Sequence, residues 1–191
     1  MLNRQILLSA LSEFGALALV WLMGPHMSPH LAFAATVGVI MVSAWRRRRD
    51  GRTRAWWTIN GLALSLALLP LLTDKIVQSF YQAALANILC AGAFAFGASG
   101  PRSLLQEFAE ARQGFSFDPG RTDISHFLRL YTLAWTAFFV LRASIWVLCG
   151  GHDGAATFLQ LAMPLSFALM LLLSFKGAWV FRIMQRVGLI S

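Results

Sequence analysis

Six long apolar runs, separated by short polar segments, make up most of this 191-residue chain. A helix needs about 20 mostly apolar residues to cross the hydrocarbon core of a membrane, and the runs are close to or above that length. The pattern therefore predicts an all-α fold, a polytopic membrane bundle that forms a single transmembrane domain over residues 1–191. The six predicted transmembrane helices cover residues 6–24, 27–45, 55–72, 76–98, 127–149 and 155–181.

The composition supports lipid as the solvent for much of the chain. Hydrophobic residues make up 58% of it and charged residues 13%, about half the charged share of a typical globular domain. A soluble fold of this size has too little interior to hide so much apolar surface. The first run is long for the apolar part of a signal peptide and lacks a small-residue cleavage site after it. We therefore expect it to be retained as a helix.

Positive charge alternates between the predicted loops, which sets the expected orientation. The second loop contains Arg46, Arg47, Arg48 and Arg49, whereas the first and fifth loops contain no Lys or Arg. The positive-inside rule then places both termini in the cytoplasm, with the chain in a bacterial inner (cytoplasmic) membrane. We expect the four arginines to contact the head groups of anionic lipids. Nucleic acid is not an expected partner despite the net charge of +8, because no basic face is interleaved with stacking aromatic residues.

The fourth loop is the longest connection, and residues 101–113 in it have an amphipathic pattern. Ser103 followed by Gln106 resembles a capping box. The apolar face consists of Leu104, Leu105 and Phe108. We expect this segment to be a short helix lying on the cytoplasmic membrane interface. Thr122 or Asp123 is expected to cap the fifth span.

Ionisable side chains inside the predicted spans are costly in a bilayer and are candidates for function. They include Glu13, Arg142 and Lys176, and Asn87 is a further intramembrane polar candidate. One hypothesis is that Glu13 pairs with Arg142 or Lys176 around a polar cavity, for proton-coupled movement or head-group binding. The alternative is that Lys176 extends its amine to the interface and that the other two form a structural ion pair. Asn87 is expected to bond across helices.

Three histidines lie at the predicted outer face. His26, His30 and His152 are joined there by Asp74 and Asp153, and imidazole and carboxylate groups are ligands for zinc or copper. The alternative is that they are ordinary polar loop residues. The sequence identifies no cofactor.

Motifs of known enzyme classes do not occur in the sequence. There is no glycine-rich phosphate loop, no nucleophile elbow and no HEXXH zinc motif. We therefore predict no catalytic residue.

From residue 81 onward the order of residues resembles a known family. The features are Tyr81, Asn87 and Phe94, then Gly100-Pro101, the amphipathic segment, Thr132, Trp135, Phe138-Phe139 and Arg182. This order resembles a family of uncharacterised bacterial inner-membrane proteins, encoded with fatty-acid-type synthesis genes for aryl polyene or xanthomonadin-like pigments. Residues 133–139 also resemble the intracellular septation protein A family. The resemblance implies an inner-membrane scaffold or lipid-related accessory protein and transfers no catalytic residue.

Three functions follow from these observations and remain open. The first is a non-enzymatic accessory or structural subunit that binds partner helices or lipids in an envelope or pigment-lipid assembly. The second is a small transporter or lipid flippase that uses Glu13 and Arg142. The third is a membrane enzyme acting on lipid or acyl substrates, with the outer histidines as its site. Membrane lipids, anionic ones above all, and other membrane proteins are the expected partners.

Overall fold

The structure is a computed structural model that describes residues 15–48, 51, 53–73, 79–150, 152 and 155–188. The described residues form helices joined by turns, without a strand among them, so the predicted all-α fold is confirmed. A helical segment at residues 15–23 comes first. The elements that follow are η1 (Gly24–His26), α2 (Pro29–Arg46), α3 (Arg54–Thr73), α4 (Ser79–Ala98), α5 (Leu104–Gln113), α6 (Thr122–Cys149), α7 (Ala155–Phe175) and α8 (Gly177–Arg186).

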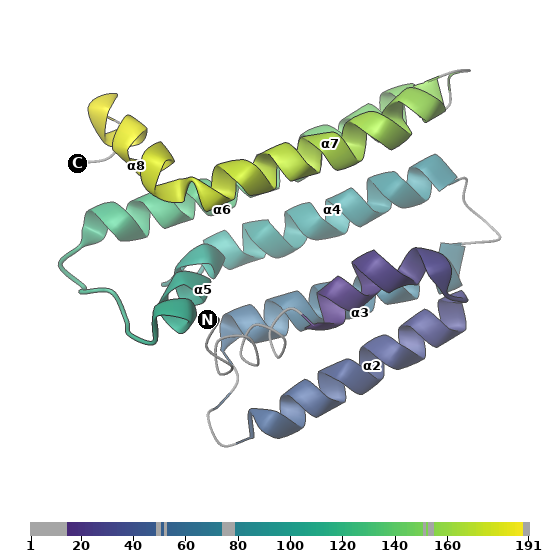
Figure 1. Ribbon diagram of the computed structural model, residues 1–191, viewed down its shortest axis with the longest axis horizontal. Helices are drawn as coiled ribbons and strands as arrows, with labels where there is room; N and C mark the ends of the chain where they lie inside the picture. Colours follow the sequence, from purple (N-terminus) through teal and green to yellow (C-terminus); the bar gives the residue numbers. More distant parts are fainter. Residues whose placement is uncertain are drawn as a thin grey trace, which may run out of the picture.

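The long helices lie side by side and alternate in direction (Figure 1). α4 packs most extensively against α6 and also contacts α3, while α2 packs on α3. α7 contacts α6, and the short helix α5 lies against α3, α4 and α6. Because the chain reverses after each long helix, the end of α2, the start of α3, α5, the start of α6 and the end of α7 share one end of the bundle (Figure 1).

Four helices have the length and composition of membrane spans, namely α3, α4, α6 and residues 157–174 of α7. They coincide with the third to sixth predicted spans. Residues 15–23 form the later part of the first predicted span, whose earlier residues lie outside the described ones. α2 matches the second predicted span and has 18 residues. It is not among the four helices that qualify as spans, because the polar residues His30 and Arg46 near its ends lower its mean hydropathy. The chain thus has the helices of a membrane protein, and the full set of six spans stays a prediction.

The start of α6 differs from the sequence prediction. The helix begins at Thr122, ahead of the predicted start at residue 127. Neither Thr122 nor Asp123 caps it, because the N-cap residue is Arg121 and no side chain there supplies a cap bond. Instead, Arg121 and Asp123 form an ion pair of 3.0 Å between Nη2 and Oδ2. α6 therefore has a polar first turn that precedes its apolar stretch.

The last apolar run, predicted as one span over residues 155–181, forms two helices. α7 ends at Phe175, Lys176 forms the turn, and α8 points away from the axis of α7 (Figure 1). Lys176 and Gly177 together explain the break, since a charge is costly inside a bilayer and glycine is a weak helix former. Pro164 lies inside the continuous helix α7.

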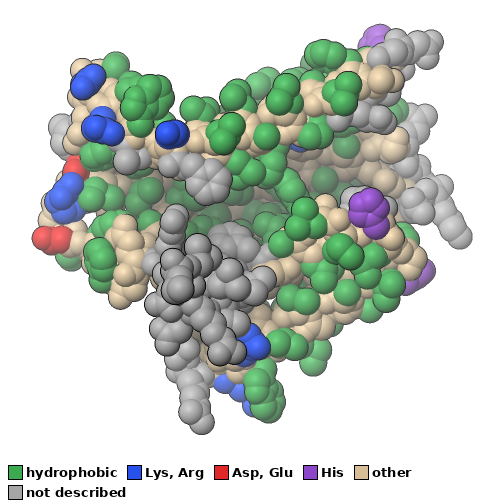
Figure 2. All heavy atoms as spheres, viewed as in Figure 1, with side chains coloured by type: hydrophobic (Ala, Val, Ile, Leu, Met, Phe, Trp, Pro, Cys, Tyr) green, Lys and Arg blue, Asp and Glu red, His purple; other side chains and the backbone are tan. Residues whose placement is uncertain are grey.

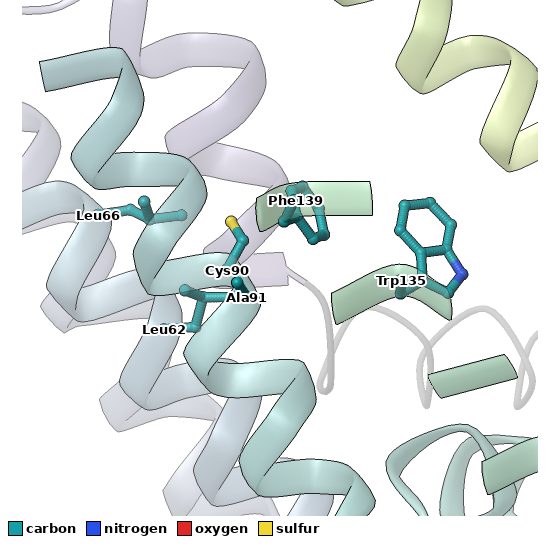
Figure 3. Packing of buried hydrophobic residues seen from close by; sticks show 6 residues of the cluster. All are labelled: Leu62, Leu66, Cys90, Ala91, Trp135 and Phe139. Carbon is teal, nitrogen blue, oxygen red and sulfur yellow. The ribbon is translucent and has the colours of Figure 1, made fainter. Parts of the chain in front are cut away.

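Among the described residues, the largest cluster of buried side chains joins α3, α4 and α6. It consists of Leu62, Leu66, Cys90, Ala91, Trp135 and Phe139 (Figure 3). The ring of Phe94 on α4 stacks on that of Trp135 with centroids 5.6 Å apart and lies 5.6 Å from that of Phe139, both on α6. Aromatic pairs contribute about 0.5–1.5 kcal/mol each beyond the area they bury. α4 and α6 are thus the most firmly joined helices.

Close packing holds α5 against the bundle. Ser103 Oγ accepts the N–H of Gln106 at 3.3 Å, as the capping-box pattern predicts, and Gly114 ends the helix in the left-handed conformation. Leu104 is 2% exposed and packs on α3. A Cβ at Gly97 of α4 would lie 2.6 Å from the Cβ of Leu104, so this approach requires glycine. The apolar side of α5 thus contacts protein, and its position at the membrane interface stays a prediction.

Two carboxylates of α5 bond to the rest of the chain. Glu107 Oε2 accepts the N–H of Ala55 in the first turn of α3 at 2.7 Å. Glu110 is 8% exposed. Its three donors are Arg102 Nη1 at 3.0 Å, Gln106 Nε2 at 3.0 Å and the N–H of Phe117 at 3.3 Å. These bonds fix the segment that follows α5 as well as the helix itself.

Two arginines bond to carbonyl groups at the end of α4. Arg54 Nη2 donates to the carbonyl of Phe96 at 2.7 Å and to Ser99 Oγ at 3.1 Å. Arg129 Nη2 donates to the carbonyl of Gly100 at 2.9 Å. The last carbonyls of a helix have no partner within it and attract positive charge. The arginines therefore join α3 and α6 to α4 at this end of the bundle.

Candidate functional site

Arg142 lies in the second half of α6 and hydrogen-bonds to the helices on either side. Its Nε donates to Asn87 Oδ1 on α4 at 3.0 Å. Its Nη1 donates to the carbonyl oxygen of Met163 at 2.6 Å and to Ser166 Oγ at 2.9 Å, both on α7. The structure thus brings together two of the predicted intramembrane polar residues, Arg142 and Asn87.

Aromatic rings line the guanidinium of Arg142. Its Cζ lies 5.3 Å from the ring centroid of Phe138 and 5.9 Å from that of Phe167, which is within the range of cation–π attraction. The side chain is half-buried. Among the described residues, no carboxylate pairs with it and no acceptor takes the N–H groups of Nη2. A cation in these surroundings is costly, so Arg142 is either a structural residue or part of a binding site.

Both roles are chemically open to Arg142. As a structural residue it ties α7 to α4 and α6, since α7 otherwise packs lightly on α6. As a binding residue it offers the N–H groups of Nη2 together with its charge. A guanidinium binds carboxylate and phosphate groups through parallel N–H donors.

A groove of about 380 Å³ lies between α4 and α6. It is lined by Ile88, Ala91, Val140, Ala143, Ser144, Val147 and Leu148. The hydroxyl of Ser144 donates to the carbonyl of Val140 at 3.0 Å within its own helix, so the groove is nearly all apolar. At 3.6 residues per turn, Arg142 lies on the opposite side of α6 from Val140. The groove and the Arg142 site are therefore separate.

Comparisons with protein-family models, with curated proteins and with solved structures each found no match. The resemblance to the pigment-associated family therefore stays a prediction.

The remaining predicted cations lie apart from Arg142. Lys176 is exposed between α7 and α8. Arg46, Arg47 and Arg48 lie at the end of α2, where the guanidinium of Arg48 lies 4.5 Å from the ring centroid of Trp45. Arg49 and Glu13 lie outside the described residues, and so does the predicted ion pair of Glu13.

The predicted histidine site is not assembled in the described part of the chain. His26, His30 and His152 are exposed. No group of three or more His, Cys, Asp or Glu side chains that could hold a metal ion occurs among the described residues. Asp74 and Asp153 lie outside them. The metal site thus stays a prediction.

Sequence reasoning does not single out Ser166 or the groove. A signal for Ser166 exists, because polar residues in membrane helices pair across helices and α7 has few of them besides Ser166 and Ser174. Ser174 Oγ lies 3.2 Å from the hydroxyl oxygen of Tyr131 on α6. The groove depends on which small residues of α4 and α6 face each other, and this requires the packing of the two helices.

Proposed function

We propose that the chain is an accessory subunit of an envelope or pigment-lipid assembly in the bacterial inner membrane, and that it catalyses no reaction itself. Its binding surface is the groove between α4 and α6, and the occupant is a transmembrane helix of a partner protein. A lipid acyl chain is the alternative occupant. This role is also the one that the resemblance to the pigment-associated family implies.

The shape and chemistry of the groove support a helix as the occupant. Ala91, Ala143 and Ser144 are small, and Ile88 and Val147 stand beside them with 52% and 48% of their surface exposed. Small residues let the backbones of two membrane helices approach closely, and this packing drives association where lipid removes the hydrophobic driving force. The groove therefore suits the side chains of another helix.

The distribution of charge supports the proposed orientation, with six spans and both termini in the cytoplasm. Lys and Arg side chains gather toward the end of the bundle that holds α5, and the histidines seen in this view lie toward the other end (Figure 2). His126, near the start of α6, lies at the basic end. Arg46, Arg54, Arg102, Arg121 and Arg186 all lie at the first end. Loops rich in Lys and Arg stay in the cytoplasm.

Co-purification from native membranes in mild detergent, with mass spectrometry of the retained molecules, tests the proposal. Ser144→Phe fills the groove without entering the core, because Ser144 is exposed and bonds only within its own helix. We expect this variant to lose a stoichiometric protein partner that the unchanged chain and Ser144→Ala retain. Leu165 on α7 is 72% exposed and lies away from the groove, so Leu165→Phe is the control that keeps the partner. Purification of the unchanged chain with lipid alone would overturn the proposal.

The N–H groups of Arg142 Nη2, which have no acceptor among the described residues, favour a second candidate function, a transporter or lipid flippase that uses Arg142 and Glu13. An anionic substrate would bind to the guanidinium during its passage across the bilayer. Arg142→Lys keeps the charge but loses the planar donors, so it should impair movement of a phosphate- or carboxylate-bearing substrate in proteoliposomes. Unchanged transport in both Arg142→Lys and Glu13→Gln would exclude this function.

A further inference from the structure

α8 follows directly after a helix that has the length and composition of a membrane span. Residues 157–174 of α7 form that span, and α8 begins at Gly177. If α7 crosses the bilayer, as in the proposed function on which this inference rests, α8 begins where the head groups lie. It then points away from the axis of α7 (Figure 1), so it does not continue across the bilayer.

One side of α8 is fixed to the bundle. The rings of Phe181 and Phe127 meet edge to face with centroids 5.1 Å apart, and Phe127 of α6 is buried. Val180 and Met184 lie next to Phe181 around the helix and are partly buried. These contacts define which sides of α8 remain outside the protein.

The outer surface of α8 has an apolar strip and a basic side. Trp179 and Ile183 of α8 and Val187, the C-cap residue that follows it, recur every four residues and form the strip, with exposed fractions of 53%, 37% and 67%. Arg182, Gln185 and Arg186 are exposed on the neighbouring side. Residues at this spacing share one face of a helix, so α8 has three distinct sides, toward protein, apolar and basic.

We propose that α8 lies in the cytoplasmic interface of the membrane and binds anionic lipids. The strip enters the acyl-chain boundary, and Lys176 and Arg186 contact phosphate groups. Amphipathic helices that carry large apolar side chains on one face and basic residues on another lie in this way, with their apolar face about 5–10 Å below the head groups. Residues 155–191 contain no Asp or Glu, so no acidic side chain in this part of the sequence opposes an anionic surface. α5 differs, because Leu104 on its apolar side is covered by protein.

Nitroxide probes in the full chain, reconstituted in vesicles, test the depth of α8. Cys90→Ala and Cys149→Ser remove the native thiols, and single cysteines at Ile183, Val187 and Gln185 receive the probe. We expect oxygen to reach the probes at Ile183 and Val187 better than a water-soluble nickel complex does. The probe at Gln185 should show the reverse order.

The charge contribution is tested in vesicles with and without phosphatidylglycerol. With the anionic lipid, Arg186→Gln should lower the ratio of membrane-inserted α8 to water-exposed α8 about fivefold, as expected for one basic residue near such a surface. It should have little effect in phosphatidylcholine alone. Arg121→Gln removes one positive charge outside α8, so it should leave the accessibility of the probe at Ile183 to oxygen and nickel unchanged.

A probe at Leu169 of α7, a residue that is 60% exposed, distinguishes failure of this inference from failure of the proposed function. If Leu169 lies in hydrocarbon but Ile183 and Val187 are as open to nickel as Gln185, α8 stands in water and the inference is wrong. Protection of Ile183 and Val187 from both reagents would mean that protein, such as a second copy, covers the strip, which also overturns it. If Leu169 itself is open to nickel, α7 does not span the membrane and the proposed function fails.

Discussion

Replacement of Arg142 tests whether its guanidinium holds α7 to the rest of the chain. Arg142→Met removes the bonds to Asn87 at 3.0 Å, to the Met163 carbonyl at 2.6 Å and to Ser166 at 2.9 Å. Hydrogen bonds between membrane helices average about 0.6 kcal/mol and reach about 1.7 kcal/mol, so the three together contribute about 2–5 kcal/mol. The substitution also relieves a cost, since arginine at the centre of a membrane helix is unfavourable by about 2.5–3.5 kcal/mol on insertion scales.

These opposing contributions nearly cancel, so the free energy of unfolding of Arg142→Met alone does not isolate the bonds. Double-mutant cycles do. We expect Arg142→Met to couple with Asn87→Ala and with Ser166→Ala by about 0.5–1.7 kcal/mol each. The assay is unfolding in mixed micelles followed by circular dichroism. Ser65→Ala is the control, because the Ser65 hydroxyl bonds to the carbonyl of Gly61 within α3. The free-energy changes of Ser65→Ala and Arg142→Met should add to within about 0.3–0.5 kcal/mol. Additive effects with Asn87→Ala and with Ser166→Ala would refute the idea that Arg142 holds these helices together.

Three further predictions concern the end of the bundle around α5 and the orientation of the chain. Gly97→Ala should lower the free energy of unfolding by about 1–3 kcal/mol, because the new methyl group meets Leu104 of α5. Gly92→Ala is the control on the same helix: its methyl group has open space, so it should raise the free energy of unfolding by up to about 1 kcal/mol. Equal effects of the two variants in unfolding titrations would contradict the close approach of α4 and α5. Glu110→Ala leaves the buried amide of Gln106 and the N–H of Phe117 without this acceptor, and it removes the ion pair to Arg102, whose side chain is 55% exposed. It should lower the free energy of unfolding by about 1–3 kcal/mol, with faster trypsin cleavage after α5; an unchanged cleavage rate would count against the network. In intact cells, an impermeant thiol reagent should label His152→Cys but not Ser116→Cys, both made without the native cysteines; labelling of both would contradict the orientation.

The long helices follow from the sequence because apolar length alone determines whether a segment can span a membrane. α3 and α4 begin and end close to their predicted limits at residues 55–72 and 76–98. The N-cap of α5 is predicted as well, since Ser103 and Gln106 form a local bond that does not depend on the rest of the fold. The helix itself begins at Leu104 and not at residue 101, where the predicted segment begins.

Features that depend on packing or on a balance of small energies are not predicted. The apolar run after residue 155 is continuous, but one lysine followed by glycine is enough to end α7 and start α8. Asn87 and Arg142 are recognisable as costly polar residues, whereas their contact depends on how α4 and α6 face each other. The amphipathic pattern of α5 indicates that one side is covered, and it does not distinguish protein from lipid as the cover.

The measurement that tests the central claim most directly is photo-cross-linking in growing cells. A benzophenone amino acid replaces Val147, which lines the groove, or Leu165, which lies on the exposed face of α7. The proposed function predicts that the probe at Val147 yields a cross-link to one membrane protein, the same one that Ser144→Phe loses on purification, and that the probe at Leu165 does not. Lipid adducts alone from both positions would contradict it.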